Sequence, residues 1–333
     1  MTAQFCVRNT DDGGEQMTNE APKIAVIAGP TATGKTALGV LLAKELNGEI
    51  VSGDSMQVYR HMNIGTAKVA SAEMQGIPHH MIDVTEPFEA YSVARYVKEA
   101  DDCVSDILSR GKLPIIVGGT GLYIDSLIAG RDFADVFSDE TIRRDLGSRY
   151  DSIGGEKMLE ELRAVDPERA KKLFPSDKNR VLRALEVYLA TGITITEHDA
   201  ASQKVPKRYN AATIALSFEN RADLYARIDA RAELMAQAGL FDEVRSILGS
   251  GIPEKCTAMQ AIGYKEAAMA IRGEISEAEA IEIIKRESRR YAKRQLTWLR
   301  RKENIGWILW NTAPDFELGR QFSTKYLDAH GIL

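Results

Sequence analysis

Residues 29–36 read Gly-Pro-Thr-Ala-Thr-Gly-Lys-Thr and fit the pattern G-x-x-x-x-G-K-[ST] of a phosphate-binding loop. The glycines let the backbone curl with its N–H groups inward, and the start of a following helix adds partial positive charge. The Lys35 ammonium can reach a terminal phosphate, and the Thr36 hydroxyl can hold a magnesium ion (Mg2+) that bridges phosphate oxygens. A tight glycine turn without a ligand is the alternative. The residues that we expect to bind a phosphate chain are Gly29, Pro30, Thr31, Ala32, Thr33, Gly34, Lys35 and Thr36.

Two further polar residues stand where predicted strands end. Asp54 follows a short apolar run, and its carboxylate could hold magnesium or take a proton from an attacking nucleophile. A turn-forming aspartate is the alternative. Thr120 follows two glycines, and its hydroxyl could contact a substrate or cap the helix predicted over residues 122–129. Ligands of parallel sheets bind beyond the carboxyl ends of the strands, so we expect three segments along one edge: 29–36, 52–57 and 118–121.

The elements that must position these residues alternate between strand and helix over the first 130 residues. Beyond them, only helical periodicity is visible up to residue 191. The strands are predicted over residues 23–28, 49–52, 81–84, 114–117, 212–216 and 307–310. The main helices are predicted over residues 37–46, 92–111, 122–129, 178–189, 221–248, 258–271 and 276–301.

This alternation is typical of the α/β class, here a P-loop NTPase-like parallel sheet flanked by helices, with a helical insertion domain. We expect the core to consist of residues 21–130 and 206–333, and the insertion of residues 131–205. Residues 1–20 are polar and contain glycine, so we expect a disordered N-terminal tail.

The composition excludes several classes of protein. The chain has 333 residues and a formal net charge of -5, so any contact with nucleic acid must be a local patch. Its three cysteines lie far apart, which argues against a disulfide framework and favours the reducing cytoplasm. No apolar run is long enough to span a membrane, and the N-terminus lacks the pattern of a secretory signal.

The strongest local charge lies from residue 286 onward in the helix predicted over residues 276–301. Acid is sparse in this stretch, with Glu287 as the main one, and its cations are Arg286, Arg289, Arg290, Lys293, Arg294, Arg300, Arg301 and Lys302. A solvated basic face is one interpretation, and contact with the phosphate backbone of RNA or DNA is the other. His79-His80 lack the spacing of a zinc site, so we expect them to form hydrogen bonds near the start of a strand.

Several ordered motifs resemble the tRNA dimethylallyltransferase family, bacterial type. They are the loop at 29–36, Asp54-Ser55 with Tyr59, Ile-Gly-Thr-Ala-Lys at 64–68, Pro78-His79-His80, Val-Gly-Gly-Thr-Gly-Leu-Tyr at 117–123, Arg-Ala-Leu-Glu-Val at 183–187, Ala-Ile-Gly-Tyr-Lys at 261–265 and Lys-Arg-Gln-Leu-Thr-Trp at 293–298. The resemblance covers about residues 22–310. The chain lacks the C-terminal Cys/His pairs of the zinc finger that eukaryotic members carry.

The resemblance implies transfer of a dimethylallyl group from dimethylallyl diphosphate to N6 of the tRNA adenosine on the 3′ side of the anticodon. It assigns the diphosphate to the loop, with less support for Arg227 and Arg231, and magnesium to Thr36. Asp54 would be the general base, with Thr120 and Lys35 as further catalytic residues. It also implies a monomer in the cytoplasm, without a membrane partner.

The tRNA anticodon stem-loop is the partner that the resemblance implies, with the insertion among the segments that contact it. The residues implied to contact the tRNA are Asp54, Ser55, Met56, Gln57, Thr120, Arg143, Asn179, Arg180, Val181, Leu182, Arg183, Gln260, Gly263, Tyr264, Lys265, Lys293 and Arg294.

Three other functions stay open on the residues alone. A small-molecule kinase that binds ATP would use Lys35 and Thr36 equally well, but it does not need the basic helix. An isopentenyltransferase acting on free adenine nucleotide would share the loop and its neighbours but not the tRNA contacts. A non-catalytic RNA-binding protein would bind RNA without turnover. The chain lacks the N-K-x-D guanine motif, which argues against a G protein.

Overall fold

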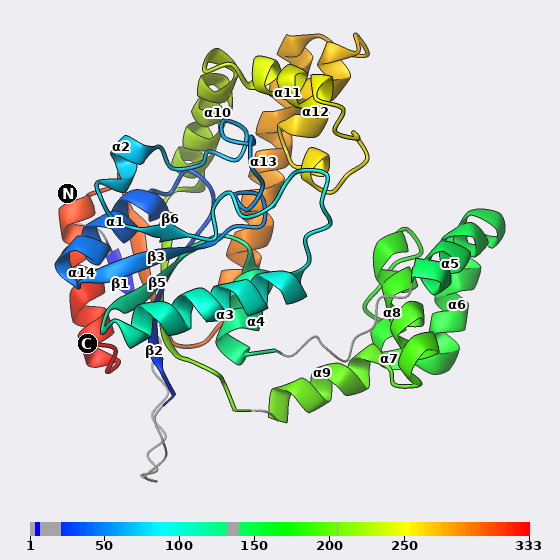
Figure 1. Cartoon of the computed structure of the whole chain (residues 1–333), viewed down its shortest axis with the longest axis horizontal. Helices are drawn as coiled ribbons and strands as arrows, with labels where there is room; N and C mark the ends of the chain where they lie inside the picture. Colours follow the sequence, from blue (N-terminus) through cyan, green and yellow to red (C-terminus); the bar gives the residue numbers. More distant parts are fainter. Residues whose placement is uncertain (1–3, 7–20, 132–139, 205) are drawn as a thin grey trace. The chain divides into compact units, whose positions relative to one another are not determined.

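The computed structural model describes residues 4–6, 21–131, 140–204 and 206–333 (Figure 1). The chain divides into two compact units, one formed by residues 1–130 and 208–333 and the other by residues 131–207. The disorder predicted over residues 1–20 falls outside the described residues, except at Gln4–Cys6. These three residues form a strand, which corrects the prediction at that point.

The first unit is built on one sheet with the strand order β1-β7-β6-β2-β5-β3-β4. Neighbouring strands are parallel, except that β1 runs antiparallel to β7 at the edge. The strands are β1 (Gln4–Cys6), β2 (Lys23–Ala28), β3 (Gly48–Gly53), β4 (His79–His80), β5 (Leu113–Gly118), β6 (Asn210–Phe218) and β7 (Ile305–Trp310). The central strands are apolar and buried along most of their length, as a parallel sheet between helices requires. The predicted α/β class is confirmed.

Helices cover both faces of this sheet (Figure 1). Helices α1 and α14 pack on one face and α3 and α4 on the other, while α10 to α13 pack on one another as a separate group. The helices of this unit are α1 (Lys35–Glu45), α2 (Ser71–Met74), α3 (Val93–Ser109), α4 (Gly121–Ala129), α10 (Arg221–Gln237), α11 (Leu240–Gly249), the 3-10 helix η1 (Ala258–Gln260), α12 (Tyr264–Ile271), α13 (Glu277–Arg300) and α14 (Phe316–Ala329).

Three differences from the predicted elements have physical causes. The strand predicted over residues 81–84 is wrong, because Met81 (φ 62°) and Asp83 (φ 56°) adopt left-handed backbone angles that no strand allows. The single helix predicted over residues 221–248 is two helices, α10 and α11, separated at Gly239 (φ 98°). Helix α14 lies outside every predicted element.

The second unit is helical, as predicted for this part of the chain. Its helices are α5 (Glu140–Ile153), α6 (Gly155–Val165), α7 (Pro167–Ala170), α8 (Lys178–Thr191) and α9 (Ile195–Lys204). They bury a core of their own that includes Leu146, Met158, Leu159, Leu162, Val181 and Leu185. Helix α8 ends at Gly192 with φ 72°, which confirms the predicted stop. In the described part of the chain, no helix is long and apolar enough to cross a membrane.

Candidate active site

The predicted phosphate loop joins β2 to α1, which is the context that phosphate binding requires. Gly34 precedes α1 with φ 85°, and a Cβ atom there would lie 2.8 Å from the ring of Phe316, so both conformation and space demand glycine. The indole N–H of Trp310 donates to the carbonyl oxygen of Thr33 at 2.9 Å. Residues from β7 and α14 therefore hold the loop from behind. The N–H groups of the first turn of α1 have no helical partner and are left for an anion.

Lys35 is the cation closest to this loop. Its Nζ donates to the carbonyl oxygen of Pro30 at 2.7 Å. Burial and the positive charge of Arg231 lower its pKa from 10.5 to about 8, against the smaller opposing effect of Asp54. Burial also lowers the pKa of Arg231 from its usual value, with Asp54 again opposing. Two positive charges are thus held close together in a largely buried site, and a bound anion would stabilise them.

A cavity of about 350 Å³ lies in front of the loop, within the first unit. The edge predicted for the sheet is confirmed, because the loop and the ends of β3 and β5 line this one cavity. From these three segments the lining residues are Thr31, Lys35, Thr36, Ser52, Asp54, Ser55, Met56, Gln57, Val117 and Gly118. Among all lining residues the charged side chains are Lys35, Arg231, Arg294 and Asp54, a formal net charge of +2. A polyanion fits this balance, although the whole chain is acidic.

Asp54 follows β3 and has two roles available at once. Its Oδ1 accepts the N–H of Met56 at 2.8 Å, so it does form a turn. Its Oδ2 has no hydrogen-bond partner among the described residues, and the side chain lines the cavity beside Lys35. One carboxylate oxygen therefore remains for a ligand, a proton or a cation.

Thr120 holds the neighbouring segment rather than capping α4. Its side chain makes no cap hydrogen bond to α4, although Thr120 occupies the cap position. Instead its Oγ1 accepts the N–H of Ser55 at 3.0 Å, and its own N–H donates to the carbonyl oxygen of Gly53 at 3.1 Å. A Cβ atom on Gly118 would lie 2.3 Å from that same carbonyl oxygen, so only glycine fits where the two strands end. Thr120 thereby fixes the segment that carries Asp54.

Helix α13 contacts the residues that follow β5 and helix α4. The side-chain amide of Gln295 donates to the carbonyl oxygen of Gly119 at 3.0 Å, and the indole N–H of Trp298 donates to Asp125 at 2.8 Å. Tyr291 lies one turn before Gln295 and lines the cavity. Burial, with a smaller contribution from the charge of Asp54, raises the pKa of Tyr291 to about 12. The phenol therefore stays protonated at neutral pH.

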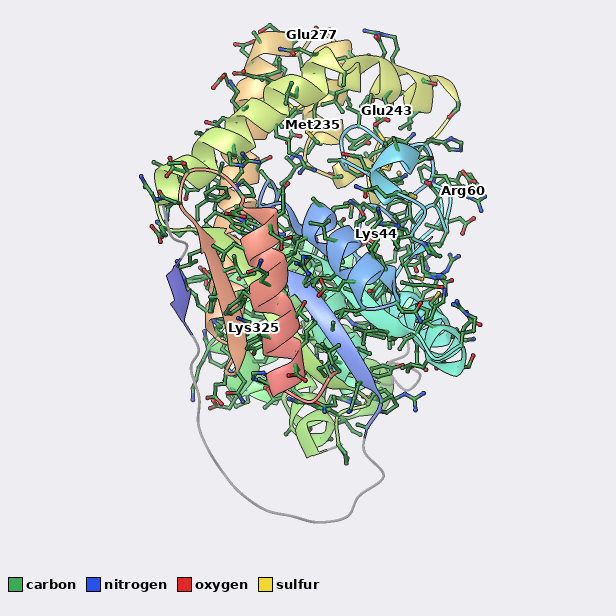
Figure 2. The ribbon with its side chains drawn as sticks, turned by 90° about the vertical axis from the view of Figure 1, so that its left-hand side faces the viewer. Lys44, Arg60, Met235, Glu243, Glu277 and Lys325 are labelled. Carbon is green, nitrogen blue, oxygen red and sulfur yellow. The ribbon has the colours of Figure 1, made fainter. Side chains whose placement is uncertain are left out.

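A carboxylate on α11 fixes the loop that forms another wall of the cavity. Glu243, labelled in Figure 2, accepts the N–H groups of Asn63 and Ile64, each at 2.9 Å, and the hydroxyl of Tyr264 at 2.5 Å. A Cβ atom on Gly65 would lie 2.3 Å from the ring of Tyr264, so this loop packs closely on α12. Gly65 itself lines the cavity.

The remaining wall is apolar and comes from α10 and α13. Ile228, Ala232 and Met235 follow one another at helical spacing on α10, and Ile284 projects from α13. Met235 is labelled on α10 in Figure 2. The cavity is thus lined both by the glycine loop and by apolar side chains of α10 and α13.

The structure places the predicted arginines differently from each other. Arg231 lines the cavity. Arg227 is exposed and lies outside the lining set; its Nε donates to the carbonyl oxygen of Ala32 at 3.2 Å. Arg227 thus contacts the backbone of the loop, and its binding of the diphosphate stays a prediction. The spacing of residues 228, 231, 232 and 235 on one helix face was the signal that could have identified this wall.

The predicted tRNA-contacting residues fall into three groups. Gln260, Gly263 and Arg294 line the cavity, and Lys265 and Lys293 are exposed. In the second unit, the side chains that are exposed or half-buried are Arg143, Asn179, Arg180 and Arg183.

The third group is buried. Tyr264 is fully buried against Gly65 and bonded to Glu243, while Val181 and Leu182 belong to the core of the second unit. The tRNA contacts implied for these three residues stay predictions.

The basic helix is partly neutralised. Arg286 and Arg290 pair with Glu287, and Arg289 pairs with Asp229. In the described part of the chain, Lys293 has no ion-pair partner. Arg294 has none there either, and its guanidinium lies 5.4 Å from the ring centre of Tyr291. The solvated-face interpretation therefore fits the first half of the run better than positions 293 and 294.

His79 and His80 form hydrogen bonds, as predicted. Nδ1 of His79 lies 2.8 Å from the carbonyl oxygen of Ile77, and Nε2 of His80 lies 2.8 Å from Glu49. Glu49 is 2% exposed and also pairs with Arg110 and Lys112. This cluster stands at the start of β3, whereas Asp54 follows its end.

The fold and the cavity define a P-loop-like α/β protein in which the glycine loop, a carboxylate and apolar side chains line one cavity. The chain belongs to the IPP transferase family, whose model matches residues 57–302, and a second model, described as isopentenyl transferase, matches residues 22–88. Relatives named tRNA dimethylallyltransferase include one from Thermoanaerobacter sp. strain X514, 46% identical over 92% of this chain and 98% of that protein. Another, from Geobacillus thermodenitrificans, is 50% identical over 86% of this chain and 90% of that protein.

Solved structures agree with this assignment. The tRNA isopentenylpyrophosphate transferase of Bacillus halodurans matches with a TM-score of 0.69 and 40% identity, covering 93% of this chain and 98% of its own. A eukaryotic dimethylallyltransferase, described as acting on tRNA, matches with a TM-score of 0.75 and 30% identity, covering 92% of this chain and 78% of its own.

Proposed function

We propose that this protein transfers a dimethylallyl group from dimethylallyl diphosphate to N6 of the tRNA adenosine on the 3′ side of the anticodon. The observation that carries the proposal is one cavity lined by the phosphate-loop Lys35, the carboxylate of Asp54 and the apolar side chain of Met235. The products are N6-isopentenyladenosine and diphosphate. Membership of the IPP transferase family and its relatives named tRNA dimethylallyltransferase support this proposal.

The two kinds of lining residue, charged and apolar, match the two parts of the donor. The diphosphate suits the loop N–H groups, the Lys35 ammonium and the Arg231 guanidinium, which together oppose its negative charge. The five-carbon group suits the wall formed by Ile228, Met235 and Ile284, where its burial removes apolar surface from water. A kinase substrate would leave this apolar wall without a partner.

The residues present also fit magnesium. Thr36 follows Lys35 and lines the cavity. Its hydroxyl would hold the ion together with substrate phosphates and water, as the serine or threonine of other phosphate loops does, which leaves the free carboxylate oxygen of Asp54 for the proton. Bound there, the ion would neutralise charge on the phosphate oxygens.

The chemistry requires one bond to break and one to form. The carbon–oxygen bond of the allylic diphosphate breaks, and its electron pair leaves with the diphosphate, which Lys35 and Arg231 stabilise. The N6 lone pair of the adenine forms the new carbon–nitrogen bond. The free Oδ2 of Asp54 takes the proton that the amine must lose. The adenine must leave its stack in the RNA to reach Asp54 in the cavity, as enzymes that act on bases require.

Exposed cations supply the sequence-independent part of tRNA binding. In the first unit, Lys265, Lys293 and Arg294 are available, and none of them has an acidic partner within the described residues. The second unit contributes Arg143, Arg180 and Arg183, the last of which pairs with Glu186 at 3.0 Å. We propose that the protein acts as a monomer in the cytoplasm on the anticodon stem-loop.

The test uses the full chain with magnesium, dimethylallyl diphosphate and an unmodified tRNA. Mass spectrometry of the digested RNA should show an adenosine heavier by one prenyl group, next to the anticodon. A second reaction contains free AMP and ATP as acceptors in place of RNA. Prenylation of the free nucleotides alone would favour the nucleotide-specific transferase. ATP turnover with a small acceptor and no prenylated product would favour a kinase.

A further inference from the structure

Gln295 on α13 has an unusual hydrogen-bonding state. The residue is 6% exposed and lines the cavity. Its Nε2 donates to the carbonyl oxygen of Gly119 at 3.0 Å, but its Oε1 is buried without any hydrogen-bond partner in the described structure. Buried acceptors in folded proteins almost always have partners. This one therefore requires an explanation.

The orientation of the amide is settled by its neighbour. A backbone carbonyl can only accept hydrogen bonds, so the group that faces Gly119 must be the NH2 of Gln295. The Oε1 is consequently directed to a different partner. Turning the amide over would set two carbonyl oxygens against each other and leave the NH2 unpaired instead.

The position of Gln295 indicates which reactant supplies the missing donor. Gly119 precedes Thr120, whose hydroxyl holds the segment that begins with Asp54. Gln295 therefore contacts the segment that holds the proposed general base, Asp54, in place. Neither a diphosphate nor a dimethylallyl group carries an N–H, whereas the amine of adenine carries two.

We propose that Gln295 recognises the 6-amino group of the target base, which rests on the proposed function. Its Oε1 accepts one N6–H, and Asp54 takes the other. Guanine and hypoxanthine carry an oxygen at this position, which would face two acceptors and be rejected. The hydrogen bond to Gln295 also draws electron density toward N6 and orients its lone pair to the donor carbon.

The test separates recognition of the amine from the hydrogen bond between Gln295 and Gly119. Wild-type protein and Gln295→Met are titrated with two anticodon stem-loops that carry either adenosine or purine riboside, which lacks the amine, at the target position. The wild type should bind the adenosine RNA at least tenfold more tightly. In Gln295→Met this preference should fall at least severalfold. Trp298→Phe is the matched control, since it breaks the tie from α13 to Asp125 outside the cavity and should weaken both RNAs alike.

Two outcomes would overturn the proposal. The first is an unchanged preference in Gln295→Met despite weaker binding, which would reduce Gln295 to a support for Gly119. The second uses only the wild type, in case Gln295→Met does not fold: NMR of an RNA with ¹⁵N at N6 should show both amine protons protected from exchange, and rapid exchange of both would exclude two acceptors. Prenyl transfer by the wild type is measured first, so a missing product would count against the proposed function, whereas normal transfer with either outcome would count only against this assignment.

Discussion

At the scale of single residues, Lys35 shows how the surrounding protein disfavours a charge that a phosphate ligand would favour. Burial and Arg231 lower the pKa of its ammonium to about 8. A bound phosphate chain would do the reverse, because an adjacent anion stabilises the charged form. Binding and protonation of Lys35 are therefore linked.

The linkage predicts a pH dependence of diphosphate binding. Below pH 8, Lys35 is already charged, so its contribution to binding is independent of pH. Above pH 8, binding must take up a proton, and the affinity should fall by up to about tenfold per pH unit. Calorimetry with inorganic diphosphate in two buffers of different ionisation enthalpy counts this proton. At pH 9 the wild type should take up more protons than Lys35→Arg, which stays charged. Equal uptake by both proteins at pH 7 and at pH 9 would contradict the linkage.

Asp54 can be tested without disturbing its turn. Asparagine at this position keeps the Oδ1 that accepts the N–H of Met56, but it cannot take a proton. Asp54→Asn should therefore lower kcat by about 10²–10⁴-fold, the usual contribution of a general base, with little change in RNA affinity. Single-turnover prenyl transfer and RNA binding measure the two effects separately. Equal losses in both would count against the general-base role.

The sequence predicts the residues whose roles follow from a local motif. Lys35, Thr36 and Asp54 lie in the predicted loop or at the predicted strand end, and all three line the cavity. It does not predict the role of Gln295, because this depends on how α13 packs over strands distant in the chain. The burial of Tyr264 is equally hidden from the sequence, since burial of a side chain cannot be read from its motif.

At the scale of elements, α13 combines two surfaces. Its buried side ties Gln295 to Gly119 and Trp298 to Asp125. Its exposed side carries Lys293, which has no acidic partner in the described part of the chain, whereas Arg289 and Arg290 are paired. The helix thus connects the part of the cavity near Gly119 to an exposed surface that suits a phosphate backbone.

Lys293 should therefore contribute to the salt dependence of tRNA binding. Removing one phosphate contact should reduce the slope of log K against log salt by about 0.7–0.9. Lys293→Ala tests this in titrations over a series of salt concentrations. Lys325→Ala is the matched control, because Lys325 is also exposed but lies on α14 (Figure 2). A slope that Lys293→Ala leaves as steep as the control would return position 293 to the solvated-face interpretation.

Elements that depend on side-chain periodicity were predictable, and those that depend on distant partners were not. The buried strands over 23–28 and 114–117 lie within the observed β2 and β5. The two-residue strand His79–His80 exists because it pairs with β3, and the apolar run after it bends away. Helix α14 has an amphipathic pattern, but its position on the sheet depends on β7 and α1.

At the scale of the whole molecule, the cluster around Glu49 ties β3 to the residues between α3 and β5. Hydrogen bonds from Arg110, and to a lesser extent from Lys112 and His80, hold the pKa of Glu49 well below its usual value of 4.5, although burial opposes this. A carboxylate whose pKa is lowered by folding contributes stability above its unfolded pKa, and this stability is lost as the pH falls below that value.

Glu49→Gln should therefore destabilise the protein mainly at neutral pH. Glu49 is buried, but Arg110 and Lys112 are partly exposed and Arg110 keeps its pair with Asp106, so the loss at pH 7 should be about 2 kcal/mol, as for hydrogen bonds to a charged group. The difference from wild type should shrink progressively below pH 4.5. Urea unfolding at pH 7 and at pH 3.5 measures it. Glu168→Gln, in an exposed pair with Lys171, is the control and should have little effect at either pH. A deficit that is the same at both pH values would contradict this account.

The support of the phosphate loop by Trp310 and Phe316 has a consequence for synthesis on the ribosome. The loop ends at residue 36, yet the residues that hold it leave the ribosome near the end of translation. Strand β6, which lies next to β2 in the sheet, and strand β7, which lies next to β6, are also made late. A nascent chain therefore carries an unfinished catalytic loop for most of its synthesis, and a chain interrupted before residue 310 never completes it. The protein thus becomes able to carry out the reaction only after β7, which includes Trp310, has been made.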